Sequence, residues 1–157
     1  MRTVDRVSIR APIERVFDAA ADVERWPALL SHYRWVSMLE RREDGGLVEM
    51  AAWRPFGAFK YPTWWVSEMR VDRSAFAVHY RHVRGITAGM DVVWQLQSVG
   101  GSTEVTIVHD WSGPAWPLIG PAAASLVIGP VFIHGIASRT LAGIARHVEG
   151  GGKAVRR

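Results

Sequence analysis

The stretch APIERVFDAAADVERWP, residues 11–27, decides how the rest of the chain is interpreted. Pro12 suits the first turn of a helix, and apolar residues follow it at the spacing of one helical face. Asp22 is a typical N-cap for a second short helix, which Pro27 limits. The stretch therefore predicts two short helices directly after a first strand.

Alternating apolar residues predict that first strand at residues 4–10 and a series of strands after the helices. A long helix to about residue 148 closes the chain. Its wide apolar stripe is best buried across the concave face of a bent antiparallel sheet, which leaves a ligand cavity beside the helix. The later strands are predicted at residues 31–42, 47–54, 59–71, 76–83, 90–97 and 103–111.

The composition indicates one globular domain. A chain of 157 residues is long enough for a sizeable core, and no repeat or linker divides it. We expect a domain over residues 1–149 and a flexible basic tail over residues 150–157.

No secretory signal pattern opens the chain and cysteine is absent, so we expect a cytoplasmic protein. The net charge of +4 is scattered and forms no basic stripe, which argues against nucleic-acid binding.

Residues 112–138 contain no Asp, Glu, Lys or Arg and satisfy a crude length test for a membrane span. Four prolines and several glycines interrupt the segment, and the turns after it are amphipathic. We therefore expect a buried helix and no stable membrane insertion. Shallow contact with a membrane stays open as an alternative.

The phrase GGSTEVTIVHDW, residues 100–111, together with the two-helix opening and the strand order, resembles the START/Bet v 1-like (SRPBCC) superfamily. Within it, the polyketide aromatase/cyclases, or cyclase/dehydrases, are the most similar group. The resemblance implies an α+β helix-grip fold, in which a curved antiparallel sheet of about seven strands wraps around the long C-terminal helix. It specifies the chemistry less well than the fold, because many relatives only bind hydrophobic ligands.

Two histidines are the candidate catalytic residues. His109 shares an apolar strand face with Trp111, which would line the cavity beside it. His134 lies at the margin of the apolar stripe of the C-terminal helix. Each is either a packed histidine with one hydrogen bond or a general acid/base. His82 is assigned to the surface or to a sheet edge. The histidine spacing fits no metal site and no phosphate-binding loop is present, so we expect no cofactor.

The resemblance adds candidate ligand-binding residues. In the similar cyclases, an arginine stands where this chain has Met69, and Arg70 points to the opposite strand face. Arg81 resembles a second family arginine near the cavity mouth, or else it is a solvated strand residue. The remaining candidates match aromatic and apolar wall positions or share a strand face with Met69: Trp26, Tyr33, Trp65, Ser67 and Met90.

Two functions follow as hypotheses. The first is a polyketide cyclase or aromatase that orients a poly-ketone or related aromatic-precursor chain and assists its cyclisation and dehydration by acid/base chemistry. The alternative is a non-catalytic protein that binds or transports a lipid, a quinone or a polyketide. The expected partners are a hydrophobic small molecule and an acyl-carrier protein, with the chain as a monomer or a homodimer.

Overall fold

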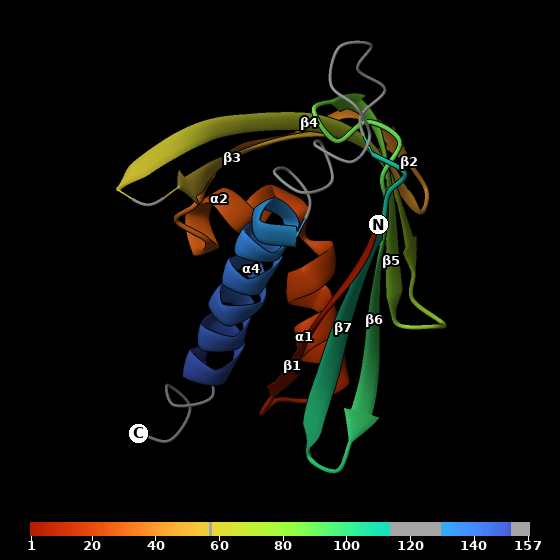
Figure 1. Ribbon diagram of the computed structural model, residues 1–157. Coiled ribbons are helices and arrows are strands. Elements are labelled where there is room, and N and C mark those ends of the chain that lie inside the picture. Colours follow the sequence, from red (N-terminus) through yellow and green to blue (C-terminus); the bar gives the residue numbers. More distant parts are fainter. Residues whose placement is uncertain (57, 114–129, 152–157) are drawn as a thin grey trace.

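A single antiparallel sheet of seven strands forms the frame of the molecule (Figure 1). The computed structural model describes residues 1–56, 58–113 and 130–151. The strands lie in the order β1-β7-β6-β5-β4-β3-β2, so the first strand pairs with the last and β1 and β2 form the two edges. Their bounds are Arg2–Ile9 (β1), Tyr33–Arg42 (β2), Gly45–Phe56 (β3), Phe59–Asp72 (β4), Ala77–Gly85 (β5), Asp91–Val99 (β6) and Ser102–Asp110 (β7).

Three short helical segments follow β1, where the opening stretch predicts two. They are α1 (Ile13–Ala21), a 3-10 turn η1 (Val23–Arg25) and α2 (Trp26–Leu29). Asp22 occupies the N-cap position of η1, as predicted, but its side chain makes no capping hydrogen bond. The backbone amide of Asp22 instead ends α1 by donating to the carbonyl of Asp18.

The closing helix, α4 (Pro130–Gly151), crosses the concave side of the sheet (Figure 1). Its buried residues recur every three or four positions, which places them on one helical face. Gly143 permits α4 to approach the end of α2, because a Cβ built there would lie 2.3 Å from Leu30 Cδ2. The buried apolar face consists of Ile133, Ala137, Leu141, Ile144 and Val148. The architecture confirms the predicted α+β helix-grip fold.

Three irregularities in strand pairing accompany the curvature of the sheet. The register shifts between Tyr33 and Trp35 and between Met38 and Glu40 in β2, and between Val66 and Ser67 where β4 pairs with β5. A bulge leaves one residue of a strand without a partner and bends that strand. In Figure 1 the long strands β3 and β4 arch over α2 and α4, while β1, β7 and β6 form the opposite wall.

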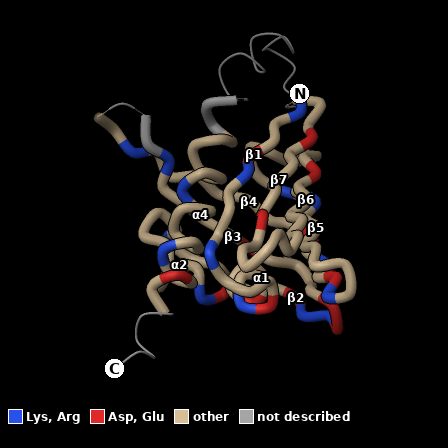
Figure 2. The backbone as a smooth tube through the Cα atoms, turned by 90° about the horizontal axis from the view of Figure 1, so that it is seen from below, with Lys and Arg blue, Asp and Glu red and all other residues tan. Residues whose placement is uncertain are grey.

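Part of the apolar segment 112–138 lies outside the described residues, as does the end of the predicted tail. Among the helices that the structure describes, none is long and apolar enough to span a membrane. Positively and negatively charged residues are scattered along the described backbone and do not gather into one block (Figure 2).

Candidate ligand-binding site

A cavity lies between α4 and the concave face of the sheet. It receives residues from α2, from β2 through β7, and from α4. Its internal volume is about 70 Å³. An apolar cavity of roughly 150 Å³ holds one benzene ring. The cavity is therefore smaller than a single ring requires, and it would have to enlarge to hold a molecule of several rings.

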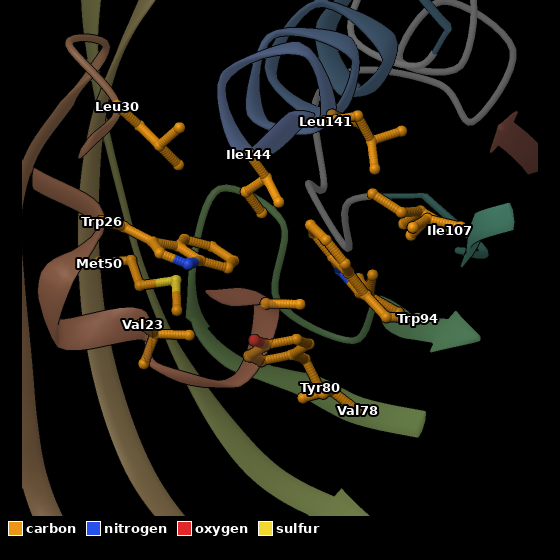
Figure 3. Close-up of a cluster of buried hydrophobic side chains, with 14 of the residues drawn as sticks. Val23, Trp26, Leu30, Met50, Val78, Tyr80, Trp94, Ile107, Leu141 and Ile144 are labelled. Carbon is orange, nitrogen blue, oxygen red and sulfur yellow. The ribbon is translucent and has the colours of Figure 1, made fainter. Parts of the chain in front are cut away.

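Aromatic rings form one wall of the cavity. Trp26 of α2 packs against Tyr33 and Trp94, with ring centroids 5.2 and 5.6 Å apart. Its indole Nε1 donates a hydrogen bond of 3.0 Å to the carbonyl of Ala19, which fixes the ring from α1. Figure 3 shows Trp26 and Trp94 on facing sides of this cluster, with Tyr80 below them. Edge-to-face and tilted aromatic contacts of this kind add stability beyond the area that the rings bury.

His82 of β5 belongs to the polar side of the cavity. Its ring stacks on Trp65 at 5.8 Å and 6°, and its Nδ1 lies 2.6 Å from the hydroxyl of Thr87. Burial, and secondarily the nearby His109, lowers the pKa of His82 to about 3. The imidazole is therefore neutral at physiological pH.

His109 of β7 lines the same side, and burial lowers its pKa to about 4. Its Nδ1 has no hydrogen-bond partner among the described residues, and neither does the buried hydroxyl of Tyr80. Burial, with a smaller contribution from Tyr33, raises the pKa of Tyr80 well above its usual value, so that hydroxyl remains a proton donor. Unpaired buried polar atoms are costly and often mark a ligand position.

His32, a third buried histidine, contacts the cavity residue Thr140. The hydroxyl of Thr140, which lines the cavity, donates to the carbonyl of Ile136 at 2.8 Å. It must therefore accept its 3.0 Å hydrogen bond from Nε2 of His32, which fixes the tautomer of that ring. Burial, followed by Arg139 and Arg146, lowers the pKa of His32 to about 4. This contact ties α4 to the start of β2.

The structure brings five of the predicted site residues together around the cavity: Trp26, Tyr33, Trp65, Met90 and His109. Ser67 and Met69 share the buried face of β4 but lie beyond the end of the described cavity. The hydroxyl of Ser67 has no partner among the described residues. Trp111 is buried, and its Nε1 donates to the carbonyl of Ala88 at 3.1 Å.

Two further candidates point elsewhere. Arg81 is exposed, and its guanidinium contacts both carboxylate oxygens of Asp91 at 2.7 and 2.8 Å. His134 is also exposed, and its Nδ1 forms a hydrogen bond with the buried carboxylate of Asp5 on β1. Neither residue lines the cavity that the structure describes.

Sequence reasoning missed Tyr80, His82 and Thr140 as cavity residues. The assignment of His82 to the surface is wrong, because the residue is buried. The signal was present, since Tyr80 and His82 alternate with exposed Arg81 along a predicted strand. No Asp, Glu, Lys or Arg lines the described cavity, and the described residues contain no cluster of metal-ligating side chains.

A model of the family described as polyketide cyclase / dehydrase and lipid transport matches residues 9–129. The chain belongs to this family. A candidate polyketide cyclase of Streptomyces cyaneus is 31% identical over 112 residues, which cover 70% of this chain and 72% of that protein. The actinorhodin polyketide synthase bifunctional cyclase/dehydratase of Streptomyces coelicolor is 29% identical over 113 residues, 71% of this chain. Only 34% of that longer relative is spanned.

The structure of this cyclase/dehydrase family member also superimposes on solved structures of low sequence identity. The Zhui aromatase/cyclase from Streptomyces sp. R1128 superimposes with a TM-score of 0.81 at 18% identity, covering 95% of this chain and 93% of that one. A START superfamily protein from Mycobacterium smegmatis gives a TM-score of 0.71 at 14% identity, with coverages of 95% and 97%. At these identities the likeness establishes the START-type helix-grip fold.

Proposed function

We propose that this protein is a polyketide cyclase that binds a poly-ketone or related aromatic-precursor chain in the cavity and promotes its cyclisation and dehydration. One observation carries the proposal. His109 and Tyr80 line a largely apolar cavity, and Nδ1 of His109 and the hydroxyl of Tyr80 have no hydrogen-bond partner among the described residues, in a chain that belongs to the cyclase/dehydrase family.

Orientation supplies the larger part of the proposed effect. A poly-ketone chain is flexible and has several carbonyls that could react with one another. The rings of Trp26, Trp65 and Trp94 provide flat surfaces against which planar enol segments of the chain stack. Holding one reacting carbon against one carbonyl converts a choice among many ring closures into a single closure.

Proton transfer supplies the remainder. Nδ1 of His109 accepts the proton of a methylene carbon between two carbonyls, and the resulting carbanion forms a carbon–carbon bond to a carbonyl carbon of the same chain. Tyr80 donates a hydrogen bond to the oxygen on which negative charge develops. The proton on His109 then returns to that oxygen, and later loss of water completes the dehydration. Because burial lowers the pKa of His109 to about 4, it is a weak base, and its contribution is modest.

Substrate binding requires the cavity to enlarge beyond about 70 Å³. Met50 and Met90 line it, and unbranched methionine side chains adopt new rotamers more readily than the packed rings around them. We further propose that the substrate arrives on an acyl-carrier protein, that the protein works in the cytoplasm, and that it acts as a monomer or a homodimer.

One observation favours the alternative of a non-catalytic carrier. The described cavity has no charged lining residue, and Met69 stands where the similar cyclases are expected to carry an arginine. Such an interior is suited to a lipid, a quinone or a finished polyketide, for which burial of apolar surface provides the affinity.

The test combines His109→Asn and Tyr80→Phe in one variant, with His134→Asn as the matched control outside the cavity. A reactive poly-ketone supplied by a reconstituted synthase is followed for product distribution, and binding of a stable aromatic product is measured by titration calorimetry. We expect the double variant to bind the product but to lose the wild-type product distribution, while His134→Asn retains both. A wild-type protein that binds the product yet leaves the product distribution equal to that without protein would establish the carrier.

A further inference from the structure

Three tryptophans lie on the outer, convex face of the sheet, which the proposed function does not use. Trp35, Trp53 and Trp64 have exposed fractions of 37%, 36% and 39%. The pairing register places Trp35 on β2 and Trp64 on β4 at either side of Ala51 on β3, and Trp53 lies two residues farther along the same face. Ala51, between them, has no exposed surface. We call Trp35, Trp53 and Trp64 the tryptophan face.

A bulge adds a cation to this face. Arg34 has no partner in β3, since Tyr33 pairs with Ala52 and Trp35 pairs with Ala51. The extra residue allows Arg34 to point to the same side as Trp35. Its guanidinium carbon lies 4.7 Å from the ring centroids of both Trp35 and Trp53. A cation is therefore held between two aromatic rings at the surface.

Further positive charge surrounds the tryptophan face. Lys60 shares the strand face of Trp64, and Arg84 lies opposite Val66 on the neighbouring strand. Both are exposed, and neither Arg34, Lys60 nor Arg84 forms an ion pair with the residues that the structure describes. The sequence from residue 50 to residue 67 contains no Asp or Glu. The adjoining carboxylate of Glu49 is engaged, because it accepts a 2.9 Å hydrogen bond from Nε1 of Trp35.

We propose that the tryptophan face docks the protein on the surface of an anionic lipid bilayer. Tryptophan rings favour the boundary between lipid headgroups and acyl chains, and unpaired lysine and arginine side chains favour anionic headgroups. The tryptophan face lies on the side of the sheet that is turned away from the cavity, and Figure 1 shows β3 and β4 with their convex side turned away from α4. The inference goes beyond the proposed function, because the tryptophan face and the cavity lie on opposite sides of the sheet.

The experiment measures flotation of the purified full chain with phosphatidylcholine vesicles that contain or lack phosphatidylserine. We expect binding only with phosphatidylserine, weakened by salt. Trp35→Ser combined with Trp53→Ser leaves the charge unchanged and should lower the partition coefficient about tenfold, since binding scales with buried apolar area. Lys60→Gln combined with Arg84→Gln should lower it about 25-fold, at about fivefold for each cation near the surface.

Matched controls are Val99→Ser, which removes an exposed apolar side chain at the far end of β6, and Arg6→Gln, which removes an exposed cation from β1. Both should bind vesicles like the wild type, and circular dichroism should show that every variant is folded. The proposal is overturned if the wild type does not float with anionic vesicles, if the tryptophan variant floats as well as the wild type, or if an acidic protein binds the face while vesicles do not.

Discussion

Trp64 and Trp65 are neighbours on one strand, and they occupy two different environments. Trp65 is 7% exposed, lines the cavity, and stacks on neutral His82. Trp64 is 39% exposed and points from the other side of β4 to the surface beside Ala51. The same residue type thus contacts neutral rings on the concave face and lies among cations on the convex face. A single curved sheet therefore carries two aromatic surfaces with different chemistry.

The largest expected difference between these surfaces is in stability. Trp65→Ala should lower the free energy of unfolding by about 3–5 kcal/mol, because it removes a buried ring and leaves a cavity. Trp64→Ala should lower it by about 0.5 kcal/mol, as is usual for surface substitutions. Urea denaturation of both variants measures the difference. Equal losses would mean that Trp64 is part of the packed core and that the two faces are not distinct.

Acid should destabilise the concave side through its histidines. Burial lowers the pKa values of His82 and His109 to about 3 and about 4 from 6.5. Between those values and pH 6.5 the unfolded chain binds more protons than the folded chain, so stability is complete above pH 6.5 and is lost as the pH falls. The loss is about 1.4 kcal/mol per pH unit for each histidine that stays neutral.

His109→Asn should therefore remove about 2 kcal/mol of the stability loss that the wild type shows between neutral pH and about pH 5. The measurement is the free energy of unfolding at both pH values. His147→Asn is the control, since that residue is exposed on α4 and does not line the cavity. An unchanged pH dependence in His109→Asn would show that His109 is already hydrated in the folded protein.

An effect of similar size is expected at Gly85, whose backbone lies beside Trp64 and Trp65. Gly85 pairs with Trp65 and has a φ of +97°, and a Cβ there would lie 2.4 Å from the carbonyl oxygen of Trp64. Gly85→Ala should lower the free energy of unfolding by about 2 kcal/mol, through strain and through displacement of β4. Gly89→Ala is the control for strain alone, because its φ is +87° but a Cβ at that position would meet no atom within 4 Å. Equal losses in both variants would exclude the clash.

Local sequence patterns predicted the fold well. The helices after β1 follow from Pro12 and the apolar spacing behind it, and the strands follow from alternation between glycine-containing turns. These are short-range effects that a pattern can record. Bulges are different, since the extra residue at Arg34 is defined only by its pairing with β3, and no local pattern announces it.

The candidate site was predicted in part for the same reason. Alternation assigns His109, Trp65 and Ser67 to the concave face, and all three are buried there. Alternation does not predict which part of each strand lies opposite α4. Trp65 lines the cavity and Ser67 does not, although both are on the same face of β4. The orientation of the His134 side chain could not be predicted from the sequence either. Apolar residues surround it in the sequence, and its contact with Asp5 joins residues that are 129 positions apart.

Because the cavity is small, tight packing of its lining side chains competes with binding of a ligand. The arrangement with about 70 Å³ of free space keeps its rings in contact, and a multi-ring ligand must separate some of those contacts to enter. The tightest-packed conformation is thus the empty one. A more rigid interior would raise the melting temperature of the protein and lower its affinity for the ligand. The side chains found at positions 50 and 90 in related proteins should therefore vary with the size of the ligand rather than with the stability of the fold.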